Sequence, residues 1–154
     1  MKPIVYVDMD NVLVDFQCGI DRLSDADREK YDGRLDECPG IFALMDPMPG
    51  AIDAVNKLAD RFELYILSTA PWLNPTAWSD KLLWVQKHFG KEKDSVFYKR
   101  LILSHHKELC TGTYLIDDRE KNGAAEFSGE LILFGGEKFP DWSAVVGYLL
   151  DTRS

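Results

Sequence analysis

The sequence of 154 residues has no excess of basic side chains. Its 18 lysines and arginines stand against 26 aspartates and glutamates, which gives a formal net charge of −8. A protein that binds the backbone of a nucleic acid needs a basic face. The shortage of positive charge therefore argues against a nucleic-acid polymer as partner. It leaves room for one small phosphate ester held by a metal ion.

Cysteine and long apolar runs are also scarce. The three cysteines, Cys18, Cys38 and Cys110, are an odd set whose spacing matches no metal site, so we expect reduced thiols in a cytoplasmic protein. No apolar run is long enough to cross a bilayer, and no basic-then-apolar signal precedes the first apolar stretch. We expect no membrane contact. Whether the protein is a monomer or a homodimer stays open.

The most informative stretch lies near the N-terminus. Residues 4–7, Ile-Val-Tyr-Val, predict a short buried strand that ends at Asp8. Asp10 follows on the same side of an extended chain. Two carboxylates this close repel each other, and Mg²⁺, which prefers oxygen ligands, would remove that cost. On this motif alone, a strand followed by an acidic loop remains an equally good interpretation.

Three later apolar runs also end in polar or charged groups. They are residues 64–67, followed by Thr69 and Ala70; residues 101–103, followed by Lys107; and residues 114–116, followed by Asp117 and Asp118. In an open α/β sheet, ligands bind at the carboxyl ends of the strands. The two acid pairs, the hydroxyl and the lysine are the parts needed to hold a metal ion and a phosphate.

The strands are expected to alternate with helices, which predicts an α/β fold: a Rossmann-like three-layer parallel sheet with a small helical cap. Helices are expected at 51–61, 78–89 and 142–150, and a fifth strand at 131–134. On the second of these helices, Leu82, Val85 and Phe89 are expected to face inward.

Residues 15–48 are too long for a simple loop after the first strand. We interpret them as a small helical cap inserted into a core domain of residues 1–14 and 49–154. A helix should begin after Ser24, which can cap it. Residues 41–45 look like an exposed apolar patch within this otherwise polar insertion.

The order and spacing of these motifs resemble the haloacid dehalogenase-like hydrolase superfamily, and more closely its 5'(3')-deoxyribonucleotidase family. The matching stretches are DMDNVLVDF (8–16), PMPGAIDAV (47–55), LSTAP (67–71), WVQKHFG (84–90) and LIDDRE (115–120). The resemblance covers nearly the whole chain except residues 17–37. One departure is Asn11, where the family usually has glycine. Asparagine tolerates left-handed backbone, so the turn should survive.

Asp8 and Asp10 are the candidate catalytic residues. A carboxylate such as Asp8 can attack a phosphoryl group and form an aspartyl-phosphate, although a strand-end acid can also simply cap a turn. Asp10 would protonate the leaving oxygen and later take a proton from water. In the resembling superfamily the phosphatases keep an acid at the position of Asp10, whereas the dehalogenase and P-type ATPase branches do not. The resemblance thus favours hydrolysis of a phosphate ester.

The resemblance also implies the metal ligands: Asp8, the backbone carbonyl of Asp10, and Asp118. Asp117 is then expected to lie just outside this set, and whether it binds the metal directly stays open. The plainer interpretation of Asp117 and Asp118 is a turn after a strand.

Substrate contacts are expected from several further residues. Thr69 can offer its hydroxyl and backbone N–H to a phosphate and Ala70 its N–H, while Lys107 supplies the counter-charge. Each could otherwise be an ordinary loop or surface residue. Lys81 matches a family lysine and is expected to pair with an acid near the site. Phe16 matches a base-contacting position of the family, and Phe16 and Phe42 could sandwich a base, with core packing as the alternative.

These expectations lead to a Mg²⁺-dependent phosphomonoesterase that acts on a nucleoside monophosphate, as a 5'(3')-deoxyribonucleotidase does. One alternative is a phosphatase or phosphotransferase for another small phosphate ester, because a short cap changes substrate choice. Another is a non-catalytic binding protein on the same fold. The presence of both Asp8 and Asp10 argues against the latter, because a pure binder has no need of both.

Overall fold

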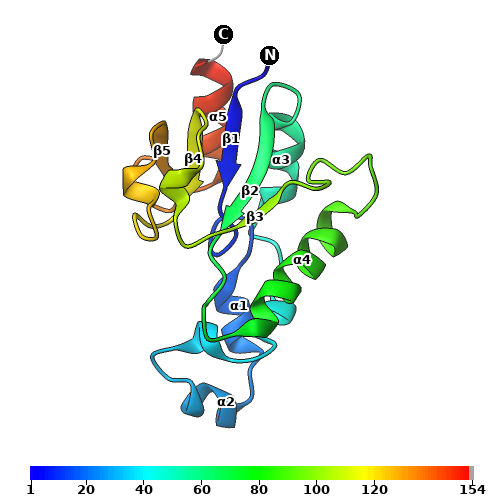
Figure 1. Cartoon of the computed structure of the whole chain (residues 1–154), viewed down its shortest axis with the longest axis vertical. Coiled ribbons are helices and arrows are strands. Elements are labelled where there is room, and N and C mark those ends of the chain that lie inside the picture. Colours follow the sequence, from blue (N-terminus) through cyan, green and yellow to red (C-terminus); the bar gives the residue numbers. More distant parts are fainter. Residues whose placement is uncertain (153–154) are drawn as a thin grey trace.

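A single parallel sheet forms the centre of the molecule in this computed structural model, which describes residues 1–152. Its strands are β1 (Ile4–Val7), β2 (Glu63–Ser68), β3 (Leu101–Leu103), β4 (Tyr114–Asp117) and β5 (Glu130–Leu133). They lie in the order β3-β2-β1-β4-β5, and every neighbouring pair is parallel (Figure 1). The carboxyl ends of all the strands therefore meet at one edge, and the predicted parallel α/β sheet is confirmed.

Within residues 1–152, five α-helices and four short 3₁₀ segments accompany the sheet. The α-helices are α1 (Phe16–Asp21), α2 (Asp25–Lys30), α3 (Ala51–Leu58), α4 (Pro75–Phe89) and α5 (Trp142–Thr152), and the 3₁₀ segments are η1 (Leu35–Glu37), η2 (Ile41–Leu44), η3 (Lys107–Leu109) and η4 (Ala124–Glu126). As expected, the Ser24 hydroxyl caps α2 by accepting from the Asp27 N–H. None of the helices within residues 1–152 is long and apolar enough to cross a bilayer.

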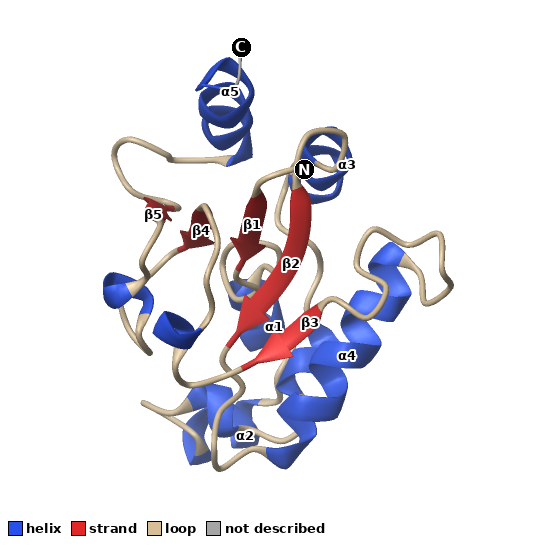
Figure 2. Cartoon of the chain, turned by 45° about the horizontal axis from the view of Figure 1, so that its top comes forward, coloured by secondary structure: helices blue, strands red, loops and turns tan. Residues whose placement is uncertain are grey.

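Alternate residues of β1 pack into two different hydrophobic clusters, one on each face of the sheet. Val5 and Val7 belong to the larger cluster, to which α3, α4 and α5 all contribute buried side chains. Tyr6 points the other way and packs with Phe127, which follows η4. Figure 1 and Figure 2 show α3 and α5 next to each other on one side of the sheet, with α4 beside β3.

The segment from α1 to η2 lies beyond the carboxyl ends of the strands (Figure 1). Ile41, Phe42 and Met45 are almost completely buried and belong to the same cluster as Val5 and Val7. The prediction of an exposed apolar patch at residues 41–45 was therefore wrong. The reason is that η2 packs against both α1 and α4, and the Trp84 indole N–H donates to the Met45 carbonyl at 2.9 Å.

Helix α4 turns a different face inward from the one predicted. Its buried residues are Ala77, Lys81, Trp84 and Val85, whereas Leu82 is 45% exposed. Val85 was correctly assigned to the inner face and Leu82 was not. Lys81 occupies a core position of this helix. A hydrophobicity pattern scores lysine as a surface residue, so it does not identify the buried face correctly.

Candidate active site

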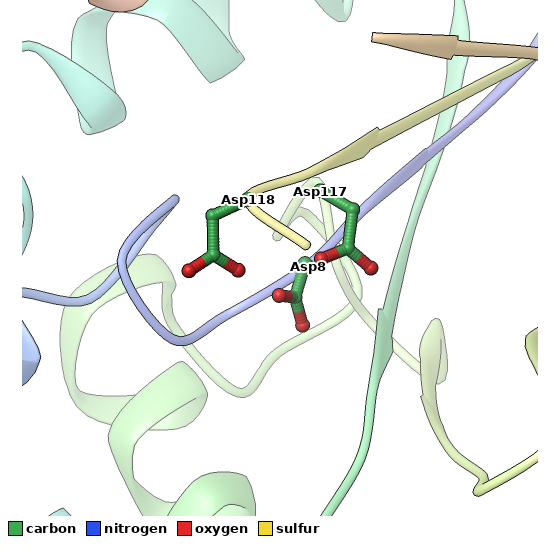
Figure 3. Close-up of side chains that lie close together, drawn as sticks. All are labelled: Asp8, Asp117 and Asp118. Atoms are coloured by element: carbon green, nitrogen blue, oxygen red, sulfur yellow. The ribbon is translucent and has the colours of Figure 1, made fainter. Parts of the chain in front are cut away.

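Three carboxylates meet where β1 and β4 end. Asp8 directly follows β1, Asp117 is the last residue of β4, and Asp118 comes next. The strands are neighbours, and the Asp8 N–H donates to the Ile116 carbonyl at 2.9 Å. One carboxylate oxygen from each of the three aspartates lies within 4.8 Å of the others (Figure 3). The sequence placed these acids at strand ends, and the sheet order brings those ends together.

This cluster is electrostatically costly. Asp8 and Asp117 are both buried. Burial first and the charge of Asp8 second raise the pKa of Asp117 to about 7 and that of Asp118 to about 6. The cluster therefore favours a bound cation or a proton over three bare charges.

Lys107 supplies part of the compensating charge. Its Nζ lies 3.2 Å from Asp8 Oδ1 and 2.5 Å from Asp117 Oδ2, and the side chain is buried. Burial alone lowers the pKa of Lys107, but the charges of Asp8 and Asp117 outweigh that effect and raise the pKa above its ordinary value. The ammonium thus stays charged beside the two acids. Its loop is fixed by a hydrogen bond from the Lys107 N–H to the Asn122 carbonyl.

Asp10 is held apart from this cluster. Its Oδ1 accepts a hydrogen bond at 3.2 Å from Lys81, which also donates to the Ser68 hydroxyl at 2.8 Å. Lys81 therefore pairs with an acid near the site, as expected. Burial raises the pKa of Asp10, and Lys81 opposes that rise.

The turn that carries Asp10 has the left-handed residue the sequence suggested. Asn11 has a φ of 62°, and the N–H groups of Val12, Leu13 and Val14 all donate to the Met9 carbonyl. The Asn11 side chain donates to Asp118 Oδ2 at 3.4 Å. The asparagine thus tolerates the backbone angle and also contacts the acid cluster.

The loop after β2 is tied to the loop after β3. The Thr69 hydroxyl donates to the Ser104 carbonyl at 2.8 Å, and Ala70 is buried next to it. The hydroxyl was expected to donate to a phosphate, but in this conformation it donates its proton to the Ser104 carbonyl instead. This leaves the backbone N–H of Thr69 as its donor for a phosphate oxygen.

A cavity of about 360 Å³ opens beside the acids, toward the segment from α1 to η1. Its lining consists of Asp10, Asn11, Phe16, Gly33, Leu35, Asp36, Asp118 and Arg119. Phe16 thus borders the same cavity as Asp10, as its predicted role requires. Arg119 was not considered from the sequence, although its place directly after the Asp117–Asp118 pair was a usable signal.

Phe42 is arranged differently from the expected base sandwich. It is 2% exposed, and its ring meets Phe16 edge-on, with centroids 5.8 Å apart and planes at 72°. A flat base between the two rings would need them parallel and open. In this structure Phe42 is a core residue whose ring packs edge-on against Phe16.

The acid cluster fits a hard divalent cation. Among the residues described, Asp118 Oδ1 is a buried oxygen without any hydrogen-bond partner. All the clustered side-chain donors are carboxylate oxygens, which Mg²⁺ prefers. A cation would satisfy that oxygen and offset the mutual repulsion. Asp10 is not one of the three clustered acids, and its Oδ1 is engaged by Lys81.

Comparisons with known proteins agree on one family. Residues 27–139 match the family model described as 5' nucleotidase, deoxy (pyrimidine), cytosolic type C protein. A Vibrio phage KVP40 protein named "putative 5'(3')-deoxyribonucleotidase" is 64% identical over 148 residues, covering 96% of this chain and 85% of that protein. The human cytosolic-type 5'(3')-deoxyribonucleotidase is 29% identical over 171 residues, covering 92% of this chain and 78% of that protein.

Among solved structures, the "putative HAD-hydrolase YfnB" of Bacillus subtilis, bound to magnesium, superposes with a TM-score of 0.62. The two chains are 12% identical, and the match covers 96% of this chain and 98% of the other. A haloacid dehalogenase-like hydrolase of Xanthomonas campestris gives a TM-score of 0.54 at 10% identity, covering 99% of this chain and 98% of that one. At such low identity these matches establish the fold, which is that of the haloacid dehalogenase-like hydrolases.

Proposed function

The chain belongs to the family described as 5' nucleotidase, deoxy (pyrimidine), cytosolic type C, and we propose that it hydrolyses deoxyribonucleoside monophosphates with Mg²⁺ through an aspartyl-phosphate on Asp8. Family membership makes it a nucleotide phosphomonoesterase. The mechanism is supported chiefly by the separation of two charged pairs. Lys107 faces Asp8 at 3.2 Å, and Lys81 faces Asp10 at 3.2 Å. Asp8 can therefore act as the nucleophile while Asp10 acts as the general acid and base.

In the first step, a carboxylate oxygen of Asp8 attacks the phosphorus and the bond from phosphorus to the ester oxygen breaks. Asp10 gives its proton to that oxygen, and the deoxynucleoside leaves. The raised pKa of Asp10, caused first by burial, supports this role because the proton is retained to a higher pH than on an ordinary aspartate. Lys107 offsets negative charge at the phosphoryl group throughout.

In the second step, Asp10 takes a proton from a water molecule. The water oxygen attacks the phosphorus of the aspartyl-phosphate, the bond from phosphorus to Asp8 breaks, and inorganic phosphate is released. Both aspartates return to their starting protonation states. The same residue therefore acts first as acid and then as base.

Asp8, Asp118 and the backbone carbonyl of Asp10 would hold the metal ion. The partnerless Oδ1 of Asp118 supports this assignment. Asp117, which is bound by Lys107 at 2.5 Å, would stay just outside the direct ligands. When bound, Mg²⁺ would neutralise the clustered carboxylates and polarise the phosphoryl oxygens.

The remaining contacts belong to the same proposal. The backbone N–H groups of Thr69 and Ala70 would bind phosphate oxygens, and Phe16 would contact the base in the cavity it borders. Residues 15–48 would act as a cap on a core domain of residues 1–14 and 49–154. The free thiols of Cys18, Cys38 and Cys110 support a reducing, cytoplasmic location.

The test is hydrolysis of a panel of deoxyribo- and ribonucleoside monophosphates and sugar phosphates, with Mg²⁺ and after chelation. The Asp8→Asn protein, purified in parallel, measures any contaminating phosphatase. We expect the deoxyribonucleotides to have the highest kcat/KM and the activity to depend on Mg²⁺. A higher kcat/KM on sugar phosphates than on any nucleotide would contradict the proposed substrate class.

A further inference from the structure

Lys81 is a lysine that no solvent reaches. Its exposure is 0%, although lysine is almost never fully buried unless it is paired. Its ammonium donates to Asp10 Oδ1 and to the Ser68 hydroxyl, and it lies 4.6 Å from the centre of the Phe42 ring. Protein groups therefore surround the charge, and a substrate in the cavity beside Asp10 cannot touch it.

These three contacts come from three separate parts of the chain. Asp10 lies in the turn after β1, Ser68 is the last residue of β2, and Phe42 lies in η2, within the segment that covers the carboxyl ends of the strands. Phe42 is 2% exposed, so its ring faces the ammonium in a dry environment, where a cation–π contact is strongest. Moving η2 would therefore disturb the position of the Lys81 charge.

The contact from Lys81 also fixes one oxygen of the Asp10 carboxyl group. With Oδ1 bound to the ammonium, rotation of the carboxyl group is restricted, and Oδ2 is the oxygen left to face a leaving group in the cavity that Asp10 borders. Proton transfer depends strongly on such orientation, because donor and acceptor must come within hydrogen-bond distance.

We propose that Lys81 and Phe42 are positioning residues for Asp10: the Phe42 ring holds the Lys81 ammonium, and the ammonium holds the Asp10 carboxyl group in the orientation that delivers a proton to the leaving oxygen. The proposal rests on the proposed function, since it assigns Asp10 as the proton donor. It gives the segment around η2 a role in the leaving-group step in addition to any role in substrate choice. The two buried lysines then have separate partners: Lys107 pairs with Asp8, and Lys81 pairs with Asp10.

The test compares phenyl phosphate with 4-nitrophenyl phosphate, which are similar in size and carry no base. Phenolate is the more basic leaving group and gains more from a donated proton. The measured quantity is the ratio of kcat/KM for phenyl phosphate to kcat/KM for 4-nitrophenyl phosphate, because kcat/KM covers the steps through departure of the leaving group. The variants are Lys81→Met and Phe42→Leu.

Phe62→Leu is the matched control. Phe62 is also 2% exposed and belongs to the same hydrophobic cluster as Phe42, but its ring faces Tyr114 instead of a lysine. It therefore reports the loss of a buried ring alone. We expect the ratio to fall about tenfold or more in Lys81→Met and roughly threefold in Phe42→Leu, and to stay unchanged in Phe62→Leu.

Equal losses on both aryl phosphates in Lys81→Met and Phe42→Leu would overturn the proposal, as would a fall in the ratio for Phe62→Leu equal to that for Phe42→Leu. If Lys81→Met does not fold, Phe42→Leu and Ser68→Ala decide the question, because both leave the charge in place. The aryl series contains no nucleotide. A wrong substrate class would therefore appear in the monophosphate panel, whereas a wrong positioning role would appear as an unchanged ratio.

Discussion

Removing divalent cations should leave a protein whose stability falls as the pH rises from about 4 to about 7. The main source is Asp117, which is 2% exposed and whose pKa is raised to about 7, first by burial and then by the charge of Asp8. An ordinary aspartate has a pKa of about 3.9. The folded state thus holds this proton more tightly than the unfolded state. The stability it contributes is fully present below about pH 4 and is lost as the pH rises to about 7.

The magnitude follows from the size of that shift. A difference of about 3 pKa units, at about 1.4 kcal/mol per unit, corresponds to about 4 kcal/mol in the free energy of unfolding over the whole pH window, of which about 3 kcal/mol falls between about pH 5 and about pH 8. Asp118, with a pKa raised to about 6, adds a cost in the same direction. A cation bound by these carboxylates favours their charged forms, so Mg²⁺ should restore much of the loss at about pH 8.

The assay is urea unfolding followed by circular dichroism at about pH 5 and about pH 8, after chelation and again with excess Mg²⁺. Asp117→Asn is the comparison, because it keeps the side-chain volume and removes the titrating group. The comparison matters because burial lowers the pKa of His88, which makes stability rise with pH and works against the effect of Asp117. A metal-free wild type with the same pH dependence as Asp117→Asn, or with no response to Mg²⁺ at about pH 8, would refute this account of the acid cluster.

Four further results concern the chemistry of the site and its choice of substrate. Asp8→Asn should keep the fold but lower kcat by several orders of magnitude, and more than about a tenth of the wild-type rate would rule out the aspartyl-phosphate route. Ca²⁺ should inhibit in steady-state assays with Mg²⁺ present, because the larger ion would take both oxygens of Asp8, and unchanged rates would count against Asp8 as a ligand. The kcat/KM ratio of dUMP to UMP should lie between about 10 and 100, since a 2'-hydroxyl placed against Phe16 and Leu35, the apolar part of the cavity lining, would lack a hydrogen bond at a cost of roughly 1–3 kcal/mol. Phe16→Ala should raise KM for nucleotides while sparing a small aryl phosphate. Equal damage to both substrates would make Phe16 a packing residue.

The sheet and the acids at its edge could be predicted from the sequence pattern. Buried parallel strands need continuous β-branched or aliphatic runs, so residues 4–7 and 101–103 could be recognised to the residue. Once the strands are parallel, their carboxyl ends share one edge, and polar residues directly after them must approach one another. Asp8 and the Asp117–Asp118 pair could be expected to meet for that reason, before any coordinates were known.

The contacts made by Lys81, Phe42 and the Thr69 hydroxyl became apparent only in the folded structure. Lys81 occupies a core position of α4, but a hydrophobicity pattern counts every lysine as a surface residue, so Leu82 was placed inside instead. The burial of Phe42 and the bond from the Thr69 hydroxyl to Ser104 depend equally on distant segments that happen to face them. Burying a charge or a hydroxyl group is costly unless a partner binds it. The partners Asp10 and Lys81 are 71 positions apart in the chain. The family resemblance predicted an acid partner for Lys81, but only the folded chain brings the two groups together and identifies that acid as Asp10.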